Sequence, residues 1–105
     1  MTFTQCRTGV YAKNTKGRLI NCVITQCGNS GILCDENALI ELEGDQTKVH
    51  GNGTSGRGYG LYTCSTSSII HLLFPLTKES VSTNNHNGQN YGSHNGGTIE
   101  TIHSF

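Results

Sequence analysis

The stretch Gly31-Ile-Leu-Cys34, followed after a short polar segment by Leu39-Ile-Glu-Leu42, decides the fold because the chain repeats it. Related glycine-led segments are Gly9-Val-Tyr-Ala12, Gly60-Leu-Tyr-Thr63 and the degenerate Gly92-Ser-His-Asn95. The matching second runs are Leu19-Ile-Asn-Cys22, Ile69-Ile-His-Leu72 and Thr98-Ile-Glu-Thr-Ile102. The glycines are spaced 22, 29 and 32 residues apart, within the range typical of repeat proteins. The sequence therefore predicts a stack of similar coils that begin near residues 9, 31, 60 and 92.

The composition suits a stack of short strands. Only 33% of the 105 residues are hydrophobic, which is lean for one compact core, and 14 are glycine. No window has the apolar spacing of an amphipathic helix, so helix should be scarce. We expect one small all-β domain that spans residues 1–105.

Strand alternation assigns the side chains of each coil to the inside or the outside of the stack. In the first strand, the outward column is Tyr11, Leu33 and Tyr62, and the inward positions are Val10, Ala12, Ile32, Cys34, Leu61 and Thr63. In the second strand, the expected outward column is Asn21, Glu41 and His71. Its two expected inward columns are Ile20 with Ile40 and Ile70, and Cys22 with Leu42 and Leu72. A third strand is expected to contribute an inward column of Ile24, Val49 and Val81.

These anchors resemble the repeat of the right-handed parallel β-helix of the pectate-lyase-like superfamily, in which a "G-I-x…x-I-x-N/C-x-I" pattern recurs. The resemblance covers residues 9 to about 102. It implies an all-β, single-stranded, right-handed parallel β-helix, a solenoid of about three and a half coils. The family includes lyases, hydrolases, epimerases, phage tailspikes and inert repeat domains, so the resemblance implies a fold and no particular activity.

Insertions should enlarge the later coils. Between the second and third strands, the second coil gains residues 43–48 and the third gains residues 73–80, so loops should grow along one edge. Residues 54–59 and 85–91 are further Gly/Asn-rich insertions that we expect to be mobile. Residues 51–56 formally match G-x-G-x-x-G, but the glycine-rich residues after Gly56 cannot begin a good helix. We interpret this segment as a flexible turn between coils and not as a nucleotide site.

Charge and cysteine content narrow the class of partner. Seven basic and seven acidic side chains give zero formal charge without a Lys/Arg cluster, so we expect no nucleic-acid partner. No apolar run is long enough to span a bilayer, and no membrane association is expected. Five cysteines cannot all pair within one chain, and we interpret them as small, reduced core residues. With no signal peptide recognised, a cytoplasmic location is slightly favoured.

No catalytic, metal or cofactor site is assigned. The histidines and cysteines do not fall at zinc-ligand spacings, and no outward column repeats an acid. The clustered carboxylates that the resemblance would imply for a polysaccharide enzyme are therefore not found, and the chain is interpreted as leaning away from catalysis.

The outward apolar column of Tyr11, Leu33 and Tyr62 is the main candidate site. It could be a contact between copies, a sugar-stacking platform, or a surface covered by the loop Phe74-Pro75-Leu76. Glu41, His71 and Asp35 are the polar candidates for ligand contact.

The ends of the stack also bear on function. Three full coils are near the minimum for a stable array, and open strand edges are normally capped or paired. We expect a non-catalytic structural or protein-interaction module that forms a homo-oligomer through its coil ends or its aromatic column. A longer parent chain would satisfy the ends equally well. The alternative function is a carbohydrate-binding or polysaccharide-active β-helix, a remnant of a lyase or hydrolase.

Overall fold

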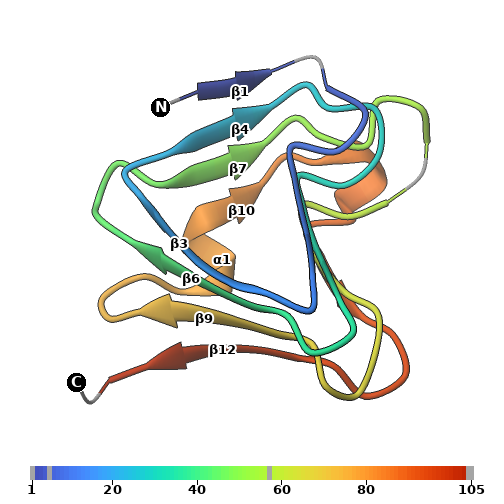
Figure 1. The fold of residues 1–105 in the computed structure, drawn as a ribbon. Helices are drawn as coiled ribbons and strands as arrows, with labels where there is room; N and C mark the ends of the chain where they lie inside the picture. The colour runs from blue at the N-terminus through green and yellow to red at the C-terminus, as the bar shows by residue number, and fades with distance from the viewer. Residues whose placement is uncertain (1, 5, 57, 104–105) are drawn as a thin grey trace.

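The computed structural model describes residues 2–4, 6–56 and 58–103 and is an all-β structure built from three sheets of four strands (Figure 1). Sheet A contains β1 (Thr2–Thr4), β4 (Val23–Thr25), β7 (Lys48–His50) and β10 (Ser82–Thr83). Sheet B contains β2 (Val10–Lys13), β5 (Ile32–Asp35), β8 (Leu61–Thr63) and β11 (Tyr91–Ser93). Sheet C contains β3 (Lys16–Ile20), β6 (Leu39–Glu43), β9 (Ile69–Leu73) and β12 (Thr98–Ile102).

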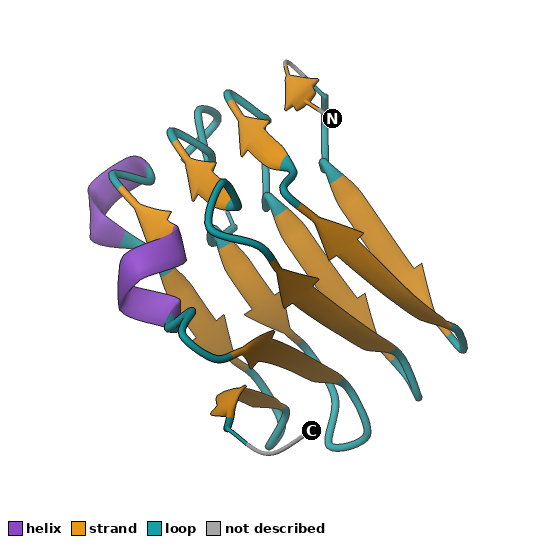
Figure 2. Ribbon diagram, turned by 90° about the vertical axis from the view of Figure 1, so that its left-hand side faces the viewer, coloured by secondary structure: helices purple, strands orange, loops and turns teal. Residues whose placement is uncertain are grey.

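Consecutive strands visit the three sheets in cyclic order, and every paired neighbour is parallel. In Figure 1 the sheets form the sides of a triangular outline, and Figure 2 shows the strands stacked with the two termini at opposite ends. This topology is compatible with a parallel β-helix. Each strand is short because it crosses one side of the triangle and then turns.

The register of sheet B confirms the predicted first-strand columns. Val10 pairs with Ile32 and Ile32 with Leu61, while Ala12, Cys34 and Thr63 align in the same way. Most of these inward side chains are buried, and only Val10 is partly exposed. The glycine before each strand is needed for close packing, since a Cβ on Gly31 would lie 2.6 Å from Val49 Cγ1.

The predicted register of the first strand in sheet C is wrong. β3 pairs with β6 so that Gly17 lies opposite Ile40 and Leu19 opposite Leu42. Ile20 therefore points outward and is 53% exposed, instead of joining the buried column of Ile40 and Ile70. The reason is that the Leu19-Ile20 doublet imitates Leu39-Ile40, whereas the turn before β3 is one residue shorter than a glycine-based count allows.

Two residues after β3 were consequently misplaced. Asn21 adopts a left-handed φ of 51° in the turn after β3 and does not belong to the outward column. Cys22 is buried, as predicted, but it lies between β3 and β4 and not beside Leu42.

The prediction of Gly92 as the fourth glycine anchor is also wrong, by two residues. Gly92 pairs with Tyr62, so Asn90 occupies the position equivalent to Gly60. In sheet A, Ile24 and Val49 align as predicted, but Ser82 rather than Val81 pairs with Val49. Val81 is buried nonetheless, because it ends a short helix that packs on the core.

The few helical residues lie in the inserted loops. The loops between sheets C and A grow from residues 21–22 to 44–47 and then to 74–81, as predicted. The last loop contains α1 (Lys78–Val81), which begins at a Thr77–Ser80 capping box, and η1 (His86–Gly88) follows β10. Figure 1 shows α1 inside the triangular outline, and α1 contacts β7, β10 and β12.

The interpretation of residues 51–56 as a flexible turn is partly wrong. Asn52 is fully buried, because its side chain bonds the backbone of the preceding coil: Oδ1 accepts from Cys27 N at 3.1 Å and Nδ2 donates to Ile24 O at 3.1 Å. Strand β1 precedes the first predicted coil, with Phe3 paired to Ile24 and packed against the core.

Candidate functional site

The predicted outward column of Tyr11, Leu33 and Tyr62 exists on sheet B and is here called the tyrosine strip. Tyr11 pairs with Leu33, and Leu33 pairs with Tyr62. Tyr11 is 58% exposed, while Leu33 and Tyr62 are half-buried. Alternation along β2, β5 and β8 creates the strip, because each of these residues lies between two inward-facing neighbours. The three residues form a continuous apolar surface across three strands.

Tyr59 extends the strip and was missed by the sequence reasoning. Its ring centroid lies 4.9 Å from that of Tyr62, with the planes tilted by 35°. It also lies over Gly92, where a Cβ would come within 2.7 Å of the Tyr59 ring. Burial is the main cause that raises the pKa of Tyr62, followed by the charges of Cys64 and Tyr59. Sequence reasoning could not find this contact, because it depends on the observed register, which places Gly92 beside Tyr62.

The loop that was considered as a cover for the strip lies elsewhere. Phe74 follows β9 of sheet C and is 54% exposed, and Leu76 is buried in the core. Among the described residues, Tyr59 is therefore the large side chain from an insertion that packs on the strip, and it leaves Tyr11 open.

Polar groups border the open end of the strip. The Tyr11 hydroxyl donates to Asp35 Oδ2 at 3.4 Å, and Lys13 Nζ lies 3.9 Å from Glu36 Oε2. The backbone N–H of Glu36 donates to Asp35 and is the main cause that lowers the pKa of Asp35; the side chain of Cys64 contributes next. Asp35 is therefore an ionised acceptor beside an exposed ring, and a poor general acid.

Glu41 and His71 lie on a different face. They pair across β6 and β9 on the outward side of sheet C, whereas Asp35 and the strip belong to sheet B. Arg18 occupies the position that we predicted for Asn21, and Glu100 extends the column beyond His71. The six candidate residues thus form two separate groups.

The sheet C column alternates Arg18 and His71 with the acidic side chains of Glu41 and Glu100. Arg18 Nη2 lies 3.1 Å from Glu41 Oε1, and Arg18 Nη1 lies 3.2 Å from Glu43 Oε1. His71 Nε2 lies 3.3 Å from Glu100 Oε2. One guanidinium therefore holds both glutamates of β6, an arrangement that suits cross-strand support more than acid/base catalysis.

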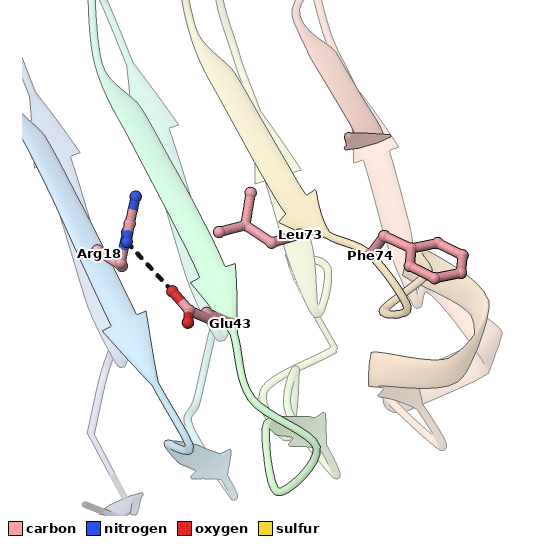
Figure 3. Close-up of a pocket in the computed structure, with 4 residues that line it drawn as sticks. All are labelled: Arg18, Glu43, Leu73 and Phe74. Carbon is pink, nitrogen blue, oxygen red and sulfur yellow. Dashed lines mark hydrogen bonds and ion pairs between the residues drawn. The ribbon is translucent and has the colours of Figure 1, made fainter. Parts of the chain in front are cut away.

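A hollow of about 330 Å³ lies at the carboxyl end of the sheet C strands and is lined by Arg18, Glu43, Leu73 and Phe74. Figure 3 shows the first three on neighbouring strands, with Phe74 beyond Leu73. The Phe74 ring packs against His103 at a centroid distance of 4.9 Å. Because the Arg18–Glu43 ion pair forms the polar side of this hollow, it offers no free charge to a ligand.

Across residues 2–4, 6–56 and 58–103, no group of three or more His, Cys, Asp or Glu side chains is arranged to hold a metal ion. In the same described residues, neither helix has the length and apolarity needed to cross a membrane. Comparison of the chain with protein-family models, curated proteins and solved structures gives no match.

Proposed function

We propose that the chain is a right-handed parallel β-helix of the pectate-lyase-like kind, with about three and a half coils counted from Gly9. The cyclic order of the strands supports this proposal, as does the parallel pairing in all three sheets. About 98% of crossover connections between parallel strands of one sheet are right-handed, which favours this hand. Strand β1 would add one side of a further coil before Gly9.

The proposed function is that of a non-catalytic structural module that binds a second copy of itself through the tyrosine strip. The observation that carries this proposal is the 58% exposure of Tyr11 at the end of an apolar column that continues through Leu33 to Tyr62. Tyrosine is enriched in protein contacts because its ring contributes large apolar area at low entropic cost.

A second copy fits the charges of the strip. Lys13 is paired with Glu36, so the Asp35 carboxylate, which accepts from Tyr11, is the one uncompensated charge among these border residues. Two strips related by a two-fold axis would place apolar residues against apolar residues, and an antiparallel arrangement would keep the two Asp35 carboxylates at opposite ends of the contact. The outer strands of each sheet pair on one side only within the described residues, and their free edges are the second surface through which copies would meet.

Light scattering coupled to size-exclusion chromatography tests self-association. We expect a concentration-dependent dimer, and the variant Tyr11→Ser should weaken it by at least about tenfold. The matched control is Ile20→Thr, which removes an equally exposed apolar side chain from sheet C and should leave the dimer unchanged. A monodisperse monomer at high concentration would refute the proposal.

The second candidate function, carbohydrate binding, is favoured by one observation: the exposed Tyr11 ring lies beside the ionised Asp35 carboxylate. Such a pair could stack on a sugar ring and accept a hydrogen bond from its hydroxyl group. A glycan array separates the two functions, since binding that is lost in both Tyr11→Ser and Asp35→Asn would favour carbohydrate. Turnover of a polyuronate would contradict the non-catalytic assignment altogether.

A further inference from the structure

A column of four equivalent residues lies where the chain leaves sheet A: Cys6, Cys27, Asn52 and Asn85. Backbone hydrogen bonds fix their alignment. Gly28 N donates to Cys6 O at 2.7 Å, Gly53 N to Cys27 O at 2.9 Å, and His86 N to Asn52 O at 2.8 Å. Each member therefore lies directly above its equivalent in the next coil.

The two asparagines of this column connect coils through their side chains. Asn52 Nδ2 donates to Asn85 Oδ1 at 3.1 Å, and Asn85 Oδ1 also accepts from Asn52 N at 3.0 Å. Both side chains are buried, so each unmade bond would leave a polar group without a partner. This corner of the stack is thus a place where side chains link one coil to the next.

The cysteines continue the column, and their alignment predicts the spacing that a covalent link requires. Neighbouring parallel strands lie about 4.8 Å apart, and a disulfide needs Cα atoms roughly 4.4–6.8 Å apart. Because Cys6 and Cys27 are aligned, their side chains also leave the backbone on the same side. Burial is the main cause that raises the pKa of Cys27; a hydrogen bond with the Cys6 backbone lowers it, and the charge and thiol of Cys6 raise it, as expected for neighbours in successive coils.

The two thiols differ in solvent exposure, and this difference suits oxidation in two steps. Cys6 is exposed, and Cys27 is fully buried. A small oxidant can reach Cys6 alone, and Cys27 can then react only with a partner already beside it.

We propose that Cys6 and Cys27 are an oxidisable pair that forms a disulfide between successive coils and fastens β1 to β4. The oxidant is a small-molecule disulfide. The Cys6 thiolate attacks one of its sulfur atoms, giving a mixed disulfide and releasing one thiolate. Cys27 gives up its proton to solvent and attacks the Cys6 sulfur, expelling the second small thiol. Two protein S–H bonds are replaced by one S–S bond, and the two electrons reduce the small disulfide to two thiols.

The other neighbouring cysteines are poorly placed for the same reaction. Cys34 pairs with Thr63, so Cys64 is one position out of register with it. Cys34 is buried inside the stack, while Cys64 interacts with Asp35 on the outward side. The Cys64 thiol donates to the Cys34 carbonyl oxygen at 3.5 Å.

The test treats the folded full chain with oxidised glutathione, quenches with N-ethylmaleimide and measures the intact mass. We expect the protein to lose two hydrogens, and fragment spectra to join Cys6 to Cys27. The variant Cys6→Ser should not lose them, whereas the matched control Cys64→Ser should behave as wild type. Oxidation should also raise the Tm of the wild type by roughly 5–15 °C and leave that of Cys6→Ser unchanged.

Three results would overturn the assignment. One is glutathione retained on Cys6 as the final product, and another is a disulfide that joins any other pair. The third is the absence of reaction in the wild type under conditions that oxidise a control dithiol. Because the decisive measurement is made on the wild type, it does not depend on the folding of any variant.

Discussion

At the residue scale, Asp35 makes several of the polar contacts at the border of the tyrosine strip. Its carboxylate accepts from Tyr11 and from the Glu36 backbone, and it interacts with the Cys64 thiol. Burial raises the pKa of Cys64 to about 11, and the hydrogen bond to Asp35 and the charge of Asp35 are the next causes. The reactivity of Cys64 therefore reports on a site residue without any knowledge of the ligand.

Asp35→Asn should make Cys64 react faster with iodoacetamide at pH 8. Removal of the negative charge lowers the pKa of the thiol, and each unit of lowering increases the thiolate fraction about tenfold at a pH below the pKa. We expect the rate of Cys64 alkylation to rise roughly threefold to tenfold. Mass spectrometry of the labelled peptide measures this rate. Exposed Cys6 provides the internal reference. Glu36→Gln is the control, since Glu36 contributes least, and equal effects of the two variants would contradict the role given to Asp35.

Single residues also show what sequence patterns could not supply. Tyr11, Leu33 and Tyr62 were predicted because alternation alone determines their side of the strand. Asn52 was not, because burial of an asparagine depends on its partners, Cys27 N and Ile24 O, which lie about one coil earlier in the chain. Tyr59 was missed for a similar reason: its packing depends on the missing side chain of Gly92.

At the element scale, β2, β5 and β8 of sheet B were predictable, whereas β11 and the first strand of sheet C were not. A glycine marks the start of β2, β5 and β8, since each start packs closely against sheet A. No such marker precedes β3, and its apolar doublet gave a register shifted by three residues, which reverses the buried face. Because of this error, Arg18 was not predicted as a member of the outward column of sheet C. Its contacts with Glu41 and Glu43 support the observed register.

The buried face of β6 provides a prediction for this element. Leu42→Ala should reduce the free energy of unfolding by about 2–5 kcal/mol, because Leu42 is fully buried between Leu19 and Leu72. Leu33→Ala makes the same chemical change on the outward face of β5 and should cost about 1 kcal/mol or less. Urea denaturation followed by circular dichroism measures both. Similar losses in the two variants would mean that the assignment of inward and outward faces is wrong.

At the scale of the whole molecule, each strand pairs only with its equivalents in the neighbouring coils, so stability should be graded along the stack. The cluster of fully buried side chains includes residues of the inner strands β4 to β9, whereas Phe3 and Ile99 near the two ends are only partly buried. Hydrogen exchange of the 105-residue chain should therefore show the slowest amides in those inner strands. Amides of β1 and β11 should exchange at least about tenfold faster, since opening them disrupts one interface instead of two. Mass spectrometry of peptic fragments would resolve this gradient. Uniform protection from β1 to β12 would show that the chain opens as one unit, and that a nearest-neighbour description does not apply to it.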